Sequence, residues 1–171
     1  MDPLGELAAA AREGDDGAVT ELVRRTQPAV WRLCRTLGSV GVADDLTQET
    51  FLRALRSLSA FRGEAPVQAW LLSIARRVCA DYVRTTQRRR RLAERLRQLP
   101  ADVPAPSPSS VEELVQRLDI DRREAFTLTQ VLGLTYDEAA HVIGCPIGTV
   151  RSRVARARGD LLAALQQAEA V

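Results

Sequence analysis

The sequence offers few side chains that could perform covalent or metal chemistry. Its one histidine, His141, stands four residues before Cys145, and two ligands do not complete a zinc site, which needs four. The acids Asp44 and Asp45 have only Glu49 near them, on the next turn of the same expected helix, which favours an acidic contact surface over a metal site. The chain has no Walker loop, GxGxxG motif or nucleophile elbow. We therefore expect a binding protein rather than an enzyme, with no cofactor and no metal.

Arginine side chains that could contact phosphate gather in two segments. The sequence has 24 basic and 22 acidic residues, and every basic residue is arginine. Nine arginines and only two acids lie between residues 76 and 97, and four arginines with no acid lie between residues 147 and 158. Compact positive charge attracts phosphate, so each segment is a candidate nucleic-acid surface. The use of arginine in place of lysine carries no weight, because a GC-rich genome encodes arginine everywhere. The alternative for each segment is a solvated helix face.

Residues 135–165 have the pattern of a helix-turn-helix. Thr135 and Glu138 have the spacing of a capping box, Gly144 ends the short helix that this box opens, and Pro146 suits the first turn of a second helix. In the second helix, the apolar residues at 150, 154, 157, 161 and 165 form an inward stripe. The opposite face would enter a DNA major groove, while its flanks and first turn would meet phosphates. The candidate DNA contacts are Thr149, Arg151, Ser152, Arg153, Ala155, Arg156 and Arg158.

The N-terminal half carries a different kind of surface. Residues 17–37 and 42–58 are expected to form amphipathic helices, with Pro28 a candidate kink or break in the first. The polar face of the second helix contains Asp45, Gln48, Glu49 and Leu52. Framed by acids and an amide, Leu52 is a candidate centre of a protein contact, although a lone exposed leucine often needs no explanation. After a loop at residues 61–66, another helix runs from residue 67 into the arginine-rich segment.

Proline and serine divide the chain into two helical parts. Residues 99–110 contain four of the eight prolines and three serines, and proline blocks helix formation. The expected fold class is therefore all-α. We expect two small helical domains, residues 1–96 and 111–171, which are joined by a flexible Pro/Ser-rich linker at residues 97–110. The helix-turn-helix lies in the C-terminal domain.

Cysteine usage and hydropathy predict a cytoplasmic protein. Cys34, Cys79 and Cys145 are odd in number and far apart in the sequence, which fits neither a disulfide framework nor a paired-thiol motif, so we expect them to pack in the core. The first residues contain acids and no basic start before an apolar run, so no signal peptide is expected. No apolar run approaches the roughly 18 residues of a membrane span, so membrane insertion is excluded.

Three stretches, in this order, resemble an extracytoplasmic-function (ECF) sigma factor, the smallest class of bacterial sigma subunits. They are DDLTQETFLRA at residues 44–54, then FRGE at 61–64 with AWLLSIAR at 69–76 and ADYVR at 80–84, and finally GLTYDEAA at 133–140 with GCPIGTVRSR at 144–153 and ARAR at 155–158. The resemblance covers nearly the whole chain apart from the linker and the ends, although the last stretch alone would also suit other helix-turn-helix regulators. It implies a protein that binds core RNA polymerase and directs promoter recognition, DNA melting and transcription initiation.

The resemblance also implies roles for particular residues. The family's polymerase-binding helix, which docks on the clamp coiled coil of the largest subunit, corresponds to Asp45, Gln48, Glu49 and Leu52. Minus-ten recognition, with a flipped base of the melted non-template strand, corresponds to Arg76, Arg77, Ala80, Arg84 and Arg88. The duplex minus-thirty-five element would be read in the major groove by the outward residues of the second helix-turn-helix helix, at 151, 152, 155 and 156. Family members are often held by an inhibitory anti-sigma factor, and the sequence does not show whether this chain has such a partner.

Two positions depart from the family, and other functions stay open. Arg77 stands where members often carry asparagine, so the preferred flipped base is open. Ala155 stands where a relative can place a larger side chain, so readout at that base pair is weak or absent. The first alternative is a conventional helix-turn-helix regulator that binds duplex DNA by itself. A helical adaptor or inhibitor that binds only proteins comes next, and an enzyme is the weakest alternative.

Overall fold

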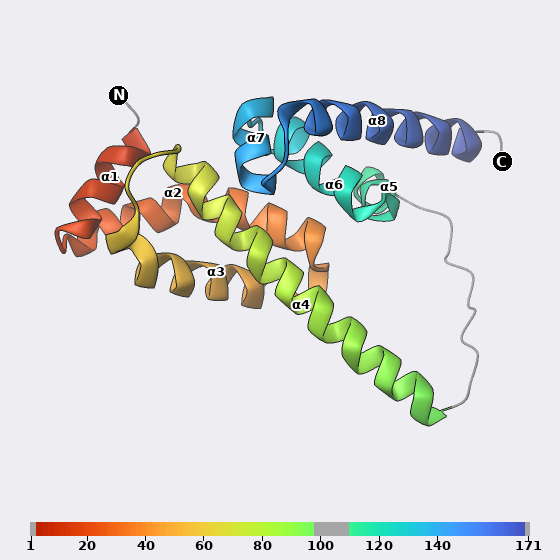
Figure 1. The fold of residues 1–171 in the computed structure, drawn as a ribbon, viewed down its shortest axis with the longest axis horizontal. Helices are drawn as coiled ribbons and strands as arrows, with labels where there is room; N and C mark the ends of the chain where they lie inside the picture. Colours follow the sequence, from red (N-terminus) through yellow and green to blue (C-terminus); the bar gives the residue numbers. More distant parts are fainter. Residues whose placement is uncertain (1–2, 98–109, 170–171) are drawn as a thin grey trace.

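The computed structural model of the chain describes residues 3–97 and 110–169, and these residues form helices joined by short turns (Figure 1). The N-terminal part contains α1 (Pro3–Arg12), α2 (Asp16–Leu37), η1 (Val40–Val42), α3 (Ala43–Ser57), η2 (Leu58–Ala60) and α4 (Val67–Arg97). The C-terminal part contains α5 (Val111–Arg117), α6 (Ile120–Phe126), the π-helical turn η3 (Thr127–Val131), α7 (Tyr136–Ile143) and α8 (Ile147–Glu169). The all-α prediction is confirmed. Most of the predicted linker, residues 98–109, lies outside the described residues.

Helices α2 and α3 begin at acidic side chains that suit a helix N-terminus. Asp15 Oδ1 accepts a hydrogen bond from Ala18 N at 3.0 Å, and Asp44 and Asp45 lie in the first turn of α3, where the helix dipole favours negative charge. Helix α2 continues through Pro28, so the break considered for this position is absent. The helix packs along its length against α1, α3 and α4, and this packing outweighs the hydrogen bond that proline removes.

The turn between α7 and α8 has the geometry that the sequence predicts. Thr135 Oγ1 accepts from Glu138 N at 3.2 Å, and Glu138 Oε2 accepts from Thr135 N at 2.8 Å, which completes the capping box. Gly144 ends α7 at a φ of 77°, a conformation that residues with a side chain rarely adopt. Helix α8 then begins at Ile147, directly after Pro146. The expected helix-turn-helix is confirmed.

Only the first half of α8 is packed as the apolar stripe predicts. Val150, Val154 and Ala157 are fully buried and Leu161 is half-buried, whereas Leu165 is 41% exposed. The prediction for Leu165 is wrong because the last turns of α8 extend beyond the shorter helices that cover its first half (Figure 1). None of the helices in the described ranges has the length and hydropathy needed to cross a membrane.

The two helical parts pack against each other. Helix α7 lies against α4 and α6 lies against α2, so that one apolar core continues from Leu72 in α4 to Val142 in α7. At the edge of this core, Gln116 Nε2 donates a hydrogen bond to the carbonyl of Arg35 at 3.1 Å. The C-terminal end of α4 projects away from the packed body (Figure 1).

Candidate nucleic-acid and protein interfaces

The outward face of α8 is free of packing. Arg151, Ser152, Ala155 and Arg156 are all exposed, and Thr149 in the first turn is half-buried. Burial of the opposite side anchors the helix in the domain, so this face is presented on a fixed support. The face division that the sequence predicts for α8 is therefore present over its first three turns.

The two flanking arginines of α8 are held by neighbours in their own domain. Arg153 Nη2 donates to Asp121 Oδ2 at 2.6 Å, and Arg158 Nη2 donates to Gln130 Oε1 at 2.6 Å. The guanidinium of Arg151 lies 6.0 Å from the ring centroid of Tyr136, at the outer limit of a cation–π contact. The two hydrogen bonds hold Arg153 and Arg158 at the flanks of the outward face, and the sequence pattern alone did not identify their partners.

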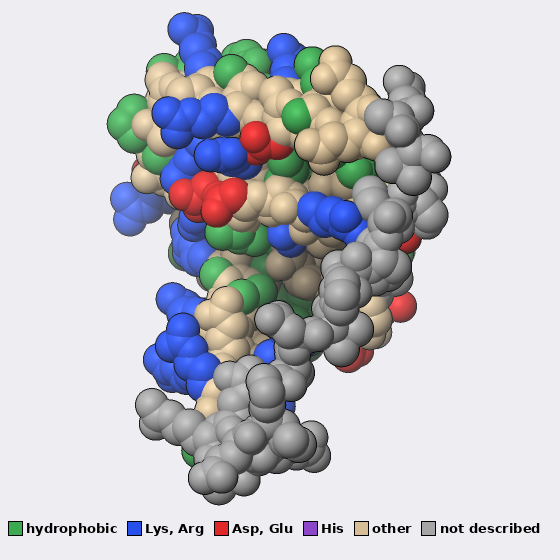
Figure 2. Space-filling model, turned by 90° about the vertical axis from the view of Figure 1, so that its right-hand side faces the viewer, with side chains coloured by type: hydrophobic (Ala, Val, Ile, Leu, Met, Phe, Trp, Pro, Cys, Tyr) green, Lys and Arg blue, Asp and Glu red, His purple; other side chains and the backbone are tan. Residues whose placement is uncertain are grey.

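Four of the five predicted minus-ten residues form a row along α4. Arg77, Ala80, Arg84 and Arg88 are exposed, and their spacing of three or four residues places them on one side of the helix. Figure 2 shows arginine side chains gathered along one edge of the molecule, from the C-terminal domain at the top down to the projecting part of α4. Such a row can follow the phosphates of a nucleic-acid strand.

The fifth predicted residue, Arg76, faces the C-terminal domain. Its Nε donates to Glu124 Oε1 of α6 at 2.5 Å. Glu124 is only 5% exposed, and burial raises the pKa of this carboxyl while the charge and hydrogen bond of Arg76 oppose the shift. Glu124 was not singled out from the sequence, although it shares a helix face with buried Leu128, four residues on. The position of this acid on an otherwise apolar helix face was the sequence feature that could have identified it.

The outward face of α3 matches its sequence prediction. Asp45 and Gln48 are exposed, Glu49 is half-buried, and Leu52 is 52% exposed among them. Leu55, one turn further along, is 41% exposed. The face therefore presents two leucines with acids and an amide beside them. Helix α3 itself lies on a different side of α4 from α7 (Figure 1).

Charged side chains connect the α3 face to the α4 row. Arg53 Nε donates to Glu49 Oε1 at 2.6 Å and Arg53 Nη1 donates to Asp81 Oδ2 at 3.0 Å, while Arg84 Nη2 donates to the other oxygen of Asp81 at 2.5 Å. Hydrogen bonds from Arg53 and Arg84 lower the pKa of Asp81. The i,i+4 and i,i+3 pairs can be read from the sequence, but the bond between α3 and α4 needs the tertiary fold.

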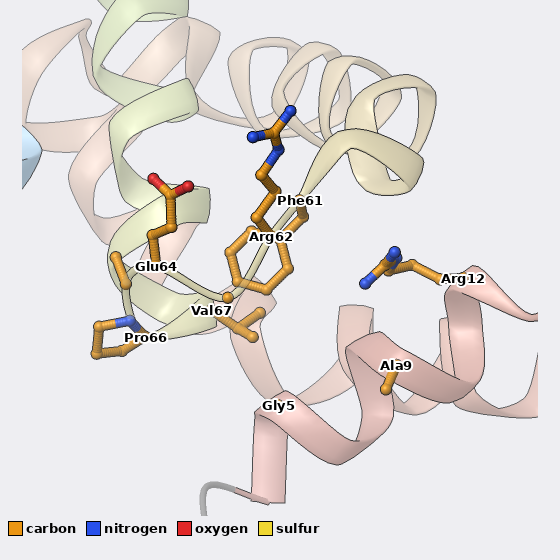
Figure 3. A pocket seen from close by; sticks show the side chains of 10 residues that line it. Gly5, Ala9, Arg12, Phe61, Arg62, Glu64, Pro66 and Val67 are labelled. Carbon is orange, nitrogen blue, oxygen red and sulfur yellow. The ribbon is translucent and has the colours of Figure 1, made fainter.

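A hollow of about 470 Å³ lies beside the loop at residues 61–66, between this loop and α1. Figure 3 shows the side chains of Arg12, Phe61, Arg62 and Glu64 around it. The ring centroids of Phe61 and Trp70 are 4.8 Å apart, so the aromatic pair supports the loop where α4 begins. The sequence predicts a loop at residues 61–66, and FRGE at 61–64 belongs to the stretches that resemble the family, but neither indicates a hollow here.

The fold brings two of the three cysteines together. Cys34 and Cys79 are fully buried on α2 and α4, and the hydrogen bond between their thiols, together with burial, raises the pKa of Cys79. Cys145 is half-buried, and its sulfur lies 3.9 Å from Arg153 Nη1. Core packing of Cys34 and Cys79 agrees with the prediction, whereas their proximity could not be read from their sequence separation.

Sequence comparison matches both helical parts to one family. Residues 22–90 match Sigma-70 region 2 and residues 109–161 match Sigma-70, region 4. The ECF RNA polymerase sigma factor SigC of Mycobacterium tuberculosis is 45% identical over 163 residues, and the match covers 92% of this chain and 88% of that protein. The ECF RNA polymerase sigma-E factor of Haemophilus influenzae is 35% identical over 170 residues, with 89% of each chain covered.

Solved structures resemble both parts as well. CnrH, in a complex with the cytosolic domain of CnrY, gives a TM-score of 0.74 at 31% identity and covers 94% of this chain and 96% of its own. The sigma factor RpoE of Bartonella quintana, in a complex with the anti-sigma factor NepR, gives a TM-score of 0.69 at 28% identity and covers 86% of this chain and 96% of its own.

Proposed function

Since the chain belongs to the extracytoplasmic-function family of RNA polymerase sigma factors, we propose that three of its surfaces divide the family's work between polymerase, melted DNA and duplex DNA. As an alternative sigma factor, the chain binds core RNA polymerase and promoter DNA and directs promoter recognition and transcription initiation. The proposed domains are residues 1–96 for polymerase and the minus-ten element and residues 111–171 for the minus-thirty-five element, with residues 97–110 as the linker.

The surface proposed for polymerase is the outward face of α3. Leu52 is more than half exposed, with Asp45, Gln48 and Glu49 beside it. An apolar side chain surrounded by polar groups is typical of the centre of a specific contact between two proteins. The proposed partner is the clamp coiled coil of the largest polymerase subunit.

The surface proposed for melted DNA is the row on α4. Exposed Arg77, Arg84 and Arg88 would follow the backbone of the non-template strand, and a flipped base would be held near residues 76–80. Extruding a base costs a few kcal/mol in lost stacking and pairing, so the protein must replace those contacts. Trapping the strand in this way would favour melting of the promoter.

The surface proposed for duplex DNA is the outward face of α8. Arg151 and Arg156 are long enough to reach base edges from a helix in the major groove, and Ser152 and Ala155 lie between them. Ala155 can contact only a thymine methyl group. Thr149, Arg153 and Arg158 would meet phosphates at the edges of the groove.

We infer three further properties from these roles. The chain itself catalyses no reaction, because polymerase makes the RNA. Its place of action is the cytoplasm, where its DNA and polymerase are. An anti-sigma factor is a further proposed partner, since RpoE of Bartonella quintana resembles this chain and was solved with NepR.

The observation that carries the proposal is that α3, α4 and α8 each keep an outward face of predicted contact residues free of packing. Run-off transcription on genomic DNA fragments with purified core polymerase, with and without the chain, tests it. We expect new start sites that share two motifs at constant spacing. Unchanged start sites, together with binding of duplex DNA by the chain alone, would support a conventional regulator instead. A Gln48→Ala, Glu49→Ala variant is the control for dependence on core binding.

A further inference from the structure

A second hollow, of about 500 Å³, lies where the last turns of α2 meet α5 and η3. Its volume is within the range of sites that bind small organic molecules. None of the residues proposed to contact polymerase or DNA lines this hollow. The hollow therefore needs an explanation that the three contact surfaces do not supply.

The walls of the hollow are aromatic and aliphatic. Trp31 of α2 and Phe126 at the end of α6 line it and are both half-buried, and Val115 and Val131 add aliphatic surface. The ring of Trp31 is held from a third helix, because its Nε1 donates to Asp44 Oδ1 of α3 at 2.8 Å. Aromatic walls that are held in place favour a planar, largely apolar ligand.

Positive charge stands beside these walls. Arg32 and Arg35 lie one turn apart on α2 and line the hollow, and the guanidinium of Arg35 is 5.5 Å from the ring centroid of Trp31. In the part of the chain that the structure describes, neither arginine forms an ion pair. Glu112 is the one acid among the lining residues, so the lining carries one positive charge in excess. This excess suits a singly charged carboxylate better than a doubly charged phosphate.

A polar group that lacks a partner lies at the same place. Thr127 lines the hollow, and its hydroxyl is buried without a hydrogen-bond partner among the described residues. Threonine in a helix adopts either of two side-chain rotamers, so a change of rotamer would let a ligand oxygen satisfy this hydroxyl. Thr127 also opens the π-helical turn η3, where its carbonyl accepts from Leu132 N at 2.9 Å. Single π-helical turns are uncommon and occur frequently at functional sites.

We propose that this hollow is a binding site for a small, planar aromatic carboxylate. The ring of the ligand packs against Trp31 and Phe126, and its carboxylate is bound by Arg32 and Arg35. The proposal goes beyond the proposed function and does not depend on it. Because the ligand contacts α2 and the C-terminal part together, its binding should also raise the melting temperature of the chain.

The test is a titration of the full-length chain, labelled with ¹⁵N at its tryptophans, with 2-naphthoate as the probe. The sequence contains two tryptophans, so nuclear magnetic resonance resolves one indole N–H signal at the hollow and one from Trp70. Trp70 packs against Phe61 and does not line the hollow, so its signal is an internal control. Two further compounds separate the contributions: 2-naphthamide has the same rings without the charge, and cyclohexanecarboxylate has the charge without an aromatic ring.

We expect 2-naphthoate to shift the Trp31 signal to saturation and to leave the Trp70 signal in place. It should bind about tenfold more tightly than 2-naphthamide, the usual scale for hydrogen bonds to a charged group. Cyclohexanecarboxylate should also bind more weakly than 2-naphthoate, because it cannot stack on the aromatic walls.

A double variant tests the two arginines directly. Arg32→Gln, Arg35→Gln should weaken 2-naphthoate binding about tenfold or more, and it keeps the Arg35 carbonyl that accepts from Gln116. Arg90→Gln, Arg91→Gln is the matched control, since it removes the same charge from exposed positions on α4 and should bind like the wild type. If the first variant fails to fold, as judged by circular dichroism, the three compounds still test the proposal on the wild type.

Three results would overturn the proposal. A Trp31 signal that does not shift to saturation with 2-naphthoate would show that the hollow is not a site for this class of ligand. Equal affinities for 2-naphthoate and 2-naphthamide would show that no carboxylate is recognised. An equal loss of affinity in the two double variants would show only a general attraction between an anion and a basic protein. The proposed function is tested separately by run-off transcription.

Discussion

Helices α4 and α8 both present arginines, but their arginines are held by different neighbours. On α8, the flanking Arg153 and Arg158 are bound within their own domain, so the whole outward face is assembled before DNA arrives. On α4, Arg76 is bound by the other domain. The difference fits the two proposed targets, because the duplex is present before the promoter opens and the melted strand exists only afterwards.

The largest effect we expect is a loss of folding stability that would disrupt the DNA-binding surfaces on α4 and α8 together. Leu72 in α4 is fully buried in the core that continues into the C-terminal domain, and Leu72→Ala should lower the free energy of unfolding by about 2–5 kcal/mol. Urea denaturation followed by circular dichroism measures this loss. Leu165→Ala, at an exposed position of α8, is the control. Equal stability of the two variants would contradict the continuous core.

The next largest effect is expected on promoter binding by α8, without a change in the affinity for core polymerase. Replacing both Arg151 and Arg156 with alanine should weaken promoter binding by about 1–3 kcal/mol for each base contact that is lost. Transcription from a promoter with an intact upstream motif measures this effect. Affinity for core polymerase should stay unchanged, and an Arg24→Ala variant on α2 controls for the loss of charge. If the double variant selected the same promoters as the wild type, the proposal that α8 contacts the bases would be contradicted.

A smaller effect is expected at the polymerase face. Leu52→Ala should weaken binding to core polymerase about tenfold, the usual scale for an apolar side chain at the centre of an interface. Titration of labelled chain with core polymerase measures the affinity. Leu162→Ala, which removes a similarly exposed leucine from α8, should leave it unchanged. If both variants bind like the wild type, the polymerase surface lies elsewhere.

The smallest effect lies away from α4 and α8 and depends on pH. Hydrogen bonds from Arg24 and Arg25 lower the pKa of Glu21 to about 2, so the folded chain favours its charged form. This stabilisation is complete above the ordinary glutamate pKa of about 4.3 and is lost as the pH falls through the lowered pKa. Glu21→Gln should therefore be slightly less stable than the wild type at pH 7. Thermal melts should converge as the pH approaches 2, and a constant difference would contradict the ion cluster.

The features that the sequence predicted correctly are those that depend on a single helix. The capping box at Thr135, the outward face of α8 and the exposed Leu52 follow from helical periodicity and local hydrogen bonding, which act within a few residues. Leu165 was misplaced because periodicity does not say where the covering helices end. Glu124 was missed because its meaning depends on Arg76, which is 48 residues away in sequence.

Site-specific crosslinking in the initiation complex tests the central claim most directly. A photoreactive amino acid would replace Ala80 on α4 or Ala155 on α8, and each variant would be assembled with core polymerase on a promoter found by run-off transcription. We predict that position 80 crosslinks to the non-template strand within the melted region and position 155 to the upstream duplex motif. Crosslinks from both positions to the same duplex motif, or from neither to DNA, would contradict the division of work between α4 and α8.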